Sequence, residues 1–593
     1  MVPFWEAALL LTLATCCSAQ SAHVSLPDQT LSTRNQSFVP IAGSASDGVG
    51  YRREIHALRE NEDEWNKHHL GLARLKEVDG SDPMSYYQIA AIHGQPYVAW
   101  DNNEPCDGCA SSGYCTHQST LFPTWHRAYM ALLEQALLLN AMSVAKQSTG
   151  DERGRYVRAA GRLRLPFWDW AKLPLETADS FPRVFTDQEV LVSTPTGRAN
   201  ITNPLKSYVF RPNEDHSFMN ANETARRPNF AVSDILQLRA DLWAALSSGQ
   251  TYPDFSTEAR LDGASKGTKS LSPSNLEALH DHVHVLVGGH MSVVSQAAFD
   301  PIFWLHHTNV DRILAIYQAA HPDEWVSQSV EAASSMWYTS GTVTDGNTSL
   351  QPFRPRAKSG FWTSNALRST RALNYTYEGL GEENVTSVIN GLHTGKISVA
   401  APDQDVHGGL AKRTDEVHGP MLWLDNGQAA GPPIKLTKHF ASIQLDAGAL
   451  NGSFTIFFFG GDFNKTNPTE RRKSRSLMAF HGFFLSGSLF NFGFRLRAGV
   501  SIPDRSFPPD LQETSGRAQR RDFGTISDLA RQRFDWRIVD ADGCIKDASN
   551  LPGLDVSIIR SEVHFPCDDA SLPVWEDFTV VETLTDRNEA ECH

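Results

Sequence analysis

The chain lacks an excess of positive charge. Its 593 residues hold 53 Lys and Arg against 68 Asp and Glu, a net charge of −15. We therefore expect no basic face for nucleic acid, and a small or uncharged substrate is easier to accommodate. Repeats and low-complexity tracts are also missing, and beyond the amino terminus no segment looks long and apolar enough to span a membrane. The length exceeds what one hydrophobic core usually supports, so we expect two or more domains.

The amino-terminal segment MVPFWEAALLLTLATCCSAQ lacks the usual Lys or Arg of a secretory signal. Its apolar run followed by small residues is nevertheless typical of a signal peptide over residues 1–19, cut after Ala19. A buried amino-terminal helix is the alternative, but the run is short and polar loop sequence follows. Eight Asn-x-Ser/Thr sequons agree with a secreted or secretory-pathway protein. They lie at Asn35, Asn200, Asn222, Asn347, Asn374, Asn384, Asn451 and Asn464.

Cysteines are few, and they fall into odd-numbered groups. Two of the eight would leave with the signal peptide. The other six are Cys106, Cys109 and Cys115, and then Cys544, Cys567 and Cys592. In an oxidising compartment each group leaves one thiol over, and the pairing cannot be deduced from spacing.

The sequence pattern changes near residue 400. Upstream, apolar residues recur three and four apart, which predicts helices. The predicted helices cover Arg53–Leu75, Ser85–His93, His126–Val144, Ser233–Leu246, Ser274–Val287 and Pro301–Ala319. Downstream, HFASIQL, SFTIFFF, AFHGFFLSG, FGFRLRAG, DWRIVD and LDVSIIR predict short strands separated by turns. We therefore predict a mainly α domain over 20–399, a linker over 400–433 and an all-β, sandwich-like domain over 434–593.

A histidine pair in LEALHDHVHVLVGGHM carries the first chemical signal. His280 and His284 are four residues apart, so they share one helical face and can bind one metal ion. A chance pair on a solvated face is the alternative. A zinc peptidase would need Glu directly after the first histidine, but Asp281 stands there.

The segment FDPIFWLHHTNVDR supplies a third histidine. Asp300 can cap a helix and Pro301 suits its first turn, which places His307 and Asp311 on one face. His307 is the expected third ligand. His306 points about a hundred degrees away around the helix, so we expect it to pack or to support the ligands. Asp311 can orient an imidazole or pair with Arg312 or another cation.

A second group of histidines lies upstream, at His93, His117 and His126. Any one of them alone is more often a structural residue than a ligand. Two groups of three histidines, without a carboxylate or a ligand-spaced cysteine pair in the upstream group, suit copper. Both Cu(I) and Cu(II) accept neutral imidazole nitrogen.

The motifs GYCTHQSTLFPTWHR, LEALHDHVH and DPIFWLHHTNVDR resemble the two copper-binding regions of fungal tyrosinases. FWTSNALRSTRALNYTYEGL is similar to the end of that family's catalytic domain, with its Tyr-x-Tyr motif at Tyr375 and Tyr377. The β-rich tail resembles the family's shielding domain. The resemblance implies an antiparallel four-helix bundle around a dicopper site, with dioxygen as co-substrate. It implies that His93, His117 and His126 bind the first copper (CuA) and that His280, His284 and His307 bind the second (CuB).

The resemblance also implies roles for five further residues. Cys115 matches a cysteine bonded through sulfur to the CuA ligand two residues later, although a disulfide with Cys106 or Cys109 is the alternative. Glu277 matches a glutamate that holds a water near CuB, but Ser274 and Glu277 also form a capping-box pattern. Asp281 departs from the Asn common among monophenol-hydroxylating relatives, and Val285 occupies a second position linked to substrate preference. Phe303 is expected to pack over CuB near the entrance.

The expected function is a copper oxidase that hydroxylates monophenols, oxidises o-diphenols to o-quinones, or does both, in melanin or phenolic-metabolite formation. The tail predicts a latent proenzyme activated by a protease, and Lys412-Arg413 is a candidate cleavage site alongside dibasic pairs elsewhere. Phe457-Phe458-Phe459 offers aromatic rings for a plug, although a sandwich core is the more ordinary use. The alternatives are a catechol or o-aminophenol oxidase, which Asp281 favours, and hemocyanin-like oxygen binding. We expect a small phenolic substrate and neither a nucleic acid nor a membrane partner.

Overall fold

The computed structural model describes most of the chain between residues 38 and 584. The described ranges are 38–44, 48–109, 112–172, 181–194, 197–261, 271–356, 360–378, 380, 385–394, 434–446, 450, 452–460, 474, 476–485, 494–503, 534–540, 543–546, 551–566 and 571–584. Residues Pro40–His593 form one compact unit. The predicted signal peptide, the linker with Lys412-Arg413, the dibasic pairs Arg471-Arg472 and Arg520-Arg521, Cys567 and Cys592 lie outside the described residues.

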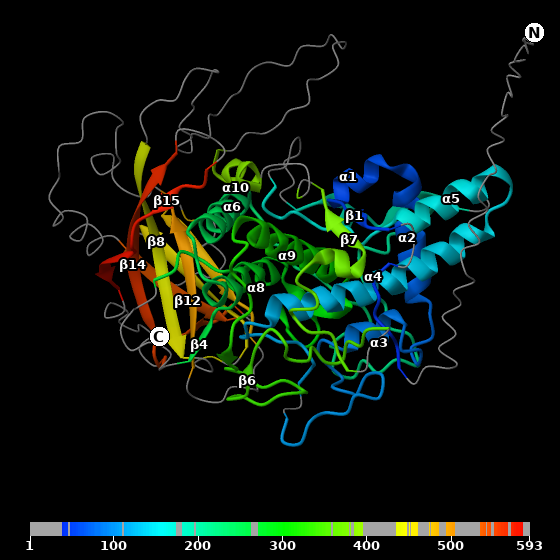
Figure 1. Ribbon diagram of the computed structural model, residues 1–593, viewed down its shortest axis with the longest axis horizontal. Coiled ribbons are helices and arrows are strands. Elements are labelled where there is room, and N and C mark those ends of the chain that lie inside the picture. Colours follow the sequence, from blue (N-terminus) through cyan, green and yellow to red (C-terminus); the bar gives the residue numbers. More distant parts are fainter. Residues whose placement is uncertain are drawn as a thin grey trace, which may run out of the picture. The chain divides into compact units, whose positions relative to one another are not determined.

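The amino-terminal half is helical, as predicted (Figure 1). Its helices are α1 (Ile55–Glu60), α2 (Glu62–Lys76), α3 (Tyr86–Ala91), α4 (Phe122–Gln147), α5 (Gly150–Arg162), α6 (Val232–Ser247), α7 (Tyr252–Ser256), α8 (Leu276–Val287), α9 (Pro301–Ala320) and α10 (Val385–Thr394). The single helix predicted over 53–75 is divided at Asn61, which caps α2 by accepting from the Glu64 backbone N–H. Helices α5, α7 and α10 were not predicted.

Helix α4 is the central helix of this half. It packs against α2, α5 and α9, and α9 packs in turn against α8 (Figure 1). Among the described helices, α4 alone is long and apolar enough by composition to cross a membrane, so the expectation that no such segment exists was wrong. Most of its apolar window, 72%, is buried inside the protein. The apolar surface of α4 is therefore used to pack the surrounding helices.

Short strands and turns complete the helical half. The strand pairs are β1 (Gly50–Arg52) with β7 (Tyr375–Tyr377), β2 (Glu189–Thr194) with β3 (Gly197–Thr202), and β5 (Ser329–Val330) with β6 (Val343–Thr344). Single 3-10 turns lie at Arg183–Phe185, Gly289–Ser292, Ala297–Phe299 and Thr370–Leu373. The parallel β1–β7 pair joins the beginning of this half to its end.

A buried charge network connects three elements of the helical half. Asp311 on α9 accepts from Arg127 Nε on α4 at 2.6 Å and from Arg52 Nη1 on β1 at 3.1 Å. The Tyr375 and Tyr377 hydroxyls on β7 donate to the same carboxylate. Both arginine side chains are fully buried. The network thereby fixes α4, α9 and the β1–β7 pair relative to one another, and it gives the Tyr-x-Tyr motif a physical role.

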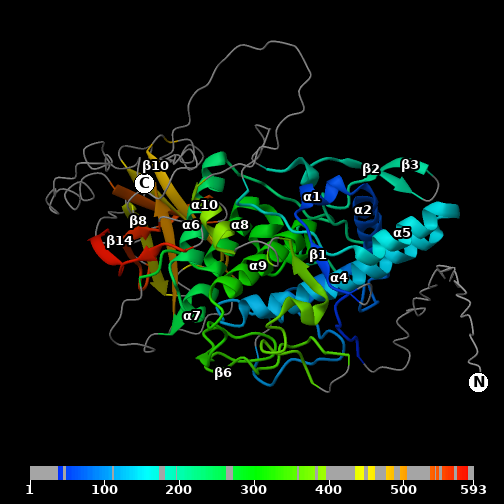
Figure 2. The same cartoon turned by 45° about the horizontal axis from the view of Figure 1, so that its top comes forward.

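The carboxyl-terminal half consists of antiparallel strands in two sheets, as predicted (Figure 2). The strands are β8 (Ile434–Asp446), β9 (Phe454–Gly460), β10 (Leu477–Phe483), β11 (Phe494–Ile502), β12 (Phe534–Asp540), β13 (Ile545–Lys546), β14 (Asp555–Phe565), β15 (Val574–Trp575) and β16 (Thr579–Thr583). One sheet has the order β10-β9-β12-β13, and the other contains β15-β14-β8-β11 with β16 paired to β14. Side chains of both sheets, Phe458 and Ile443 among them, share one apolar core.

A strand of the helical half completes the second sheet. Strand β4 (Ala259–Leu261) follows α7 in the chain and pairs antiparallel with β11, so that Ala259 lies opposite Leu496. Nearby, Arg497 forms an ion pair with Asp254 at 3.0 Å, and Ala278 of α8 belongs to the apolar core of the carboxyl-terminal half. The two halves therefore share both a sheet and a core.

Candidate metal centre

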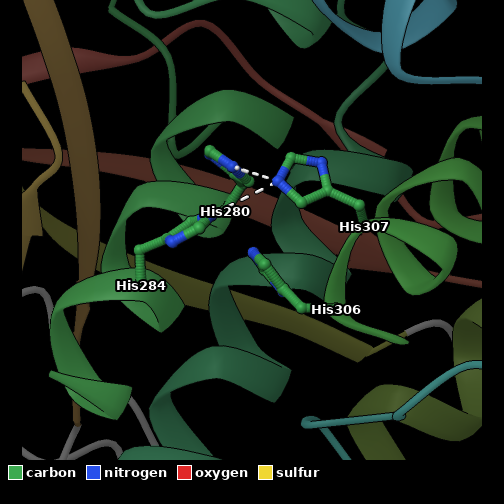
Figure 3. A group of neighbouring side chains, drawn as sticks. All are labelled: His280, His284, His306 and His307. Atoms are coloured by element: carbon green, nitrogen blue, oxygen red, sulfur yellow. Dashed lines mark hydrogen bonds between the residues drawn. The ribbon is translucent and has the colours of Figure 1, made fainter. Parts of the chain in front are cut away.

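Helices α8 and α9 bring the downstream histidines together. His280 and His284 lie one turn apart on α8, and His307 lies on α9 (Figure 3). The Nε2 atom of His307 lies 3.1 Å from Nε2 of His280 and 3.3 Å from Nε2 of His284. Three nitrogens converge on one point, as an ion with imidazole ligands requires.

The upstream histidines form a second triad from three different elements. His126 lies near the start of α4, His93 follows α3, and His117 lies in the loop before α4. Their ring centroids are 5.3 to 5.6 Å apart. The two triads meet where His126 stacks on His307 at 4.4 Å. All six predicted ligand residues therefore lie in one buried cluster, in two groups of three.

Hydrogen bonds at the ring nitrogen Nδ1 fix the orientation of three of the six histidines. Nδ1 of His93, His126 and His284 contacts the backbone carbonyls of Val294, Phe122 and Met291 at 3.1, 2.8 and 2.7 Å. Such contacts hold the proton on Nδ1 and leave the Nε2 lone pair free for a metal. Nε2 of His93 and of His126, and both ring nitrogens of His117, are buried without a hydrogen-bond partner. Buried polar atoms rarely lack a partner, so the cluster fits metal ligation.

Burial keeps these imidazoles neutral. It lowers the pKa of His117 to about 3, and it lowers the pKa of His93 well below the usual value, with a smaller contribution from His117. For His280 and His284, burial and neighbouring histidines act in the same direction. A metal binds neutral imidazole, so the cluster does not need to lose protons before it accepts an ion near neutral pH.

His306 contributes more than the helical spacing indicated. Its ring packs in parallel on His280 at 5.1 Å and edge-on to His284 at 4.8 Å (Figure 3). Both ring nitrogens are buried without a hydrogen-bond partner, and one lies within 4.8 Å of ligand atoms of the downstream triad. The ring supports the ligands, as expected, but it also adds a fourth nitrogen to this group.

Asp311 takes the second of its two predicted alternatives. Its carboxylate pairs with Arg52 and Arg127, and so it binds cations in place of orienting a histidine ligand. Arg312 lies on the same helix but reaches Asp169 at 3.4 Å. Proximity in the sequence suggested Arg312 as the partner of Asp311. The cations that pair with Asp311 instead come from β1 and α4.

Glu277 is buried in the first turn of α8 and does not cap it. Asn275 is the N-cap and accepts from the Ala278 backbone N–H, so the capping-box alternative is wrong. The Glu277 carboxylate instead accepts from the Gln118 N–H at 2.7 Å, directly after His117, and from the Thr257 hydroxyl at 2.7 Å. Burial raises the pKa of Glu277 to about 7 despite these hydrogen bonds. The carboxyl group is thus held beside the upstream triad in a state that can exchange a proton near neutral pH.

Asp281 joins the two halves of the chain at the downstream triad. Its Oδ1 lies 2.8 Å from Nδ1 of His280, and its Oδ2 accepts from the Phe484 backbone N–H at 3.1 Å. The carboxylate is fully buried. Burial raises its pKa, and the nearby carboxylates of Glu258 and Glu277 raise it further.

Cys115 is a free thiol, while Cys106 and Cys109 form a disulfide. The Cys115 sulfur and ligand nitrogens of His93 and His117 lie within 4.8 Å of one another. Burial raises the pKa of the thiol to about 12. Among the described residues, the arrangement leaves Cys115 beside the histidine that the thioether prediction requires.

The aromatic ring that covers the site comes from a residue that the sequence did not single out. Phe484, just after β10, stacks face to face on His284 at 4.0 Å and is fully buried. Its ring also lies 5.8 Å from His117 and from His280, so it contacts both triads. The run Phe457–Phe459 lies in β9 and is buried in the carboxyl-terminal half.

The other two predicted residues, Phe303 and Val285, lie on α9 and α8. Phe303 on α9 packs at 4.1 Å from His307 and 4.9 Å from His93, between the two triads. Val285 on α8 faces β10, where a Cβ atom added to Gly482 would lie 2.6 Å from the Val285 Cβ. Glycine at 482 therefore permits the close approach of β10 to α8.

Comparison with known proteins agrees with this geometry. Residues 83–320 match the family model described as the common central domain of tyrosinase. Tyrosinase from Podospora anserina is 33% identical over 368 residues, 57% of this chain and 63% of that protein, which is less than two thirds of its length. Polyphenol oxidase 4 from Agaricus bisporus is 33% identical over 471 residues, which cover 73% of each chain.

A solved structure shares the whole arrangement of helices and sheets. The structure of latent and active mushroom tyrosinase superposes with a TM-score of 0.71 at 24% identity, covering 92% of this chain and 99% of that one. The helical half and the antiparallel sheets that follow are thus a fold that this chain shares with that structure. The chain belongs to the tyrosinase and polyphenol oxidase family of type-3 copper proteins.

Proposed function

We propose that this chain is a latent polyphenol oxidase that binds two copper ions and uses dioxygen to oxidise o-diphenols to o-quinones and to hydroxylate monophenols. The observation that carries the proposal is the meeting of two buried histidine triads whose metal-facing nitrogens have no other use. His93, His117 and His126 would hold CuA, and His280, His284 and His307 would hold CuB. When bound, the copper pair supplies dioxygen activation and two-electron oxidation.

The residues of the chain orient the ligands and handle protons. Backbone carbonyls hold the Nδ1 protons of three ligands, so their Nε2 lone pairs stay aimed into the centre. Each catechol gives up two electrons and two protons, and two catechols reduce one dioxygen to two waters. Glu277, with its raised pKa and its contact to the residue after His117, is the proposed proton acceptor.

Asp281 supports the runner-up function, a catechol or o-aminophenol oxidase without monophenol hydroxylation. A carboxyl group contacts His280 where relatives that hydroxylate monophenols commonly carry an amide, so the hydrogen bonding beside this ligand differs. The two functions share the oxidation of catechols and differ only in the hydroxylation step.

Oxygen uptake by the copper-loaded protein tests the function. We expect two coppers per chain, little uptake by the intact chain, and rapid catechol oxidation once the carboxyl-terminal half has been cleaved and removed. Uptake with the matching monophenol would establish hydroxylation, and its absence would select the runner-up. Two bound coppers without uptake from any phenol, catechol or o-aminophenol would refute the oxidase proposal and point to oxygen binding.

Replacing Phe484 with alanine should partly activate the intact chain. Displacing a buried phenylalanine costs about 1.5–3 kcal/mol, so its removal should raise catechol oxidation about tenfold to hundredfold. Phe480→Ala is the matched control, because Phe480 lies on β10, just before Phe484, and its ring packs at 4.8 Å against His282. An equal rise in both variants would show that loosening of β10, and not the ring over His284, causes the activation.

We also propose the thioether between Cys115 and His117. The free thiol lies beside this histidine, and neither ring nitrogen of His117 has a hydrogen-bond partner to hold the ring. A bond from Sγ to a ring carbon would supply that restraint. It would replace the S–H bond and one ring C–H bond and release two protons and two electrons, which dioxygen, the proposed oxidant, would accept. Peptide mass spectrometry of protein made with copper should find the two residues covalently linked, and Cys115→Ser should abolish the link. Recovery of an alkylatable Cys115 thiol from fully loaded, active protein would contradict it.

We propose that the chain is exported through the secretory pathway. Of the four sequons in the described residues, Asn200, Asn222 and Asn347 are exposed and can accept a glycan. Asn374 is less accessible, because its side-chain amide donates to the Ser44 carbonyl at 2.8 Å. We propose that a protease cuts within 400–433 after export.

A further inference from the structure

The backbone that carries Phe484 is held against α8 by a short series of N–H donors. The Gly482 N–H donates to Nδ1 of His282 at 3.0 Å, and the Phe484 N–H donates to Oδ2 of Asp281 at 3.1 Å. The Leu485 N–H turns away and donates to the Ser453 hydroxyl. Asp281 is therefore the point at which the backbone of the covering residue meets a side chain that also contacts a proposed copper ligand.

Each oxygen of Asp281 accepts one hydrogen bond, from His280 and from the Phe484 backbone, and the Asp281 side chain also shares a hydrogen bond with Glu258. The Nε2 atom of His280 faces His307, so its Nδ1 carries the proton and donates to Oδ1 of Asp281. The Phe484 N–H donates to Oδ2. A carboxylate offers two acceptor oxygens, whereas an asparagine amide offers one oxygen and an NH2 group that would face the other donor. An amide at this position can satisfy only one of the two donors.

We propose that Asp281 is a positioning residue that links the CuB ligand His280 to the closed form of the chain, in which the carboxyl-terminal half covers the metal centre. One oxygen orients the imidazole, and the other holds the backbone that places the Phe484 ring over His284. The inference rests on the proposed latent oxidase. It gives the acidic residue at this position a role in holding the closed state, separate from any effect on the choice of substrate.

The same contact changes when the chain opens. Departure of the carboxyl-terminal half takes away the Phe484 N–H, so Oδ2 of Asp281 loses its donor while Oδ1 keeps His280. Oδ1 then holds His280 without the second contact that fixes the Asp281 side chain in the closed form. A ligand of CuB therefore differs between the closed and open forms in a way that removal of the ring alone does not reproduce.

Asp281→Asn tests the coupling in the intact chain. Leaving one buried donor without an acceptor should raise catechol oxidation by the uncut chain about tenfold relative to its own opened form. After cleavage within 400–433, the carboxyl-terminal fragment should also separate about tenfold faster on size exclusion. Separation of the fragment can be measured without oxidase activity. This part of the experiment therefore tests the role of Asp281 even where the proposed function fails.

Asp241→Asn is the matched control. Asp241 on α6 is also buried between the halves and accepts from the Ser501 N–H at 2.7 Å, but it follows no histidine in the chain. An amide oxygen can keep that bond, so latency and fragment release should match the unmodified chain. Equal changes in both variants, or an Asp281→Asn chain that binds two coppers and stays as latent as the original, would overturn the proposal.

Hydrogen exchange on the unmodified chain provides a check that needs no variant. Peptides that contain the Phe484 amide should be protected in the intact copper-loaded protein and should lose that protection once the fragment has separated. Full exchange of this amide at the earliest time in the intact chain would overturn the proposal, because a donor bonded to a buried carboxylate cannot exchange at that rate.

Discussion

Replacing His284 with alanine should remove copper from one half of the centre and abolish oxygen uptake. His284 supplies one of the three Nε2 atoms that converge near His307, and the remaining two ligands cannot hold an ion as firmly. We expect about one copper per chain and a loss of at least about a thousandfold in catechol oxidation, since dioxygen needs both ions. Metal analysis and an oxygen electrode measure the two quantities on the same sample.

A neighbouring histidine provides the control for this variant. His282 lies on the same helix but accepts from Gly482 of the carboxyl-terminal half. His282→Ala should therefore retain two coppers and, after the carboxyl-terminal half has been removed, normal oxidation. Normal turnover of His284→Ala with a single copper would refute the assignment of His284 and with it the dicopper mechanism.

Replacing Asp311 with alanine should destabilise the fold more than any change at the protein surface. The substitution leaves the fully buried Arg52 and Arg127 without a shared acceptor, and loss of one partner of a buried ion pair costs about 3–5 kcal/mol. Asp169→Ala, which breaks the less buried pair with Arg312, should cost at most about 1 kcal/mol. Thermal unfolding of both variants, followed by circular dichroism, compares them; similar melting temperatures would contradict the prediction.

The pH dependence of this contribution follows from the Asp311 pKa. Burial alone would raise it, but Arg127 and Arg52 hold the pKa below its usual value. A carboxyl group with a lowered pKa in the folded state stabilises the fold above its unfolded pKa, near 4, and loses that contribution as the pH falls through the folded value. The difference in melting temperature between Asp311→Ala and the original chain should therefore be constant near neutral pH and shrink below about pH 4.

The sequence predicted the elements and residue types well because their signals are local. Apolar periodicity identified α8 and α9 to within two residues at each end, and their histidines lie where helical spacing put them. The strand segments after residue 434 formed the expected sheets. Contacts made across the fold had no such signal. Arg52, which is 259 residues from Asp311, provides one of its cations, and a strand from the helical half completes a sheet of the other.

The covering residue shows the same limit. Three consecutive phenylalanines in 457–459 formed the strongest aromatic signal, yet Phe458 lies in the core of the β half and Phe457 packs against Phe480. Phe484 carries no comparable pattern, and its position over His284 depends on the end of β10 and on the close approach of Gly482 to Val285. Local sequence predicts which residues are apolar, whereas packing between the halves decides which ring reaches the metal site.

The pairing of strand β4 bears on whether the proposed cleaved protein associates with itself. While the chain is closed, its backbone groups pair with β11. Departure of the carboxyl-terminal half would leave Ala259–Leu261 as an open strand edge, and open edges recruit strands from other molecules. The proposed cleavage would thus also expose this strand edge, so self-association would begin once the carboxyl-terminal half has left and would depend on protein concentration.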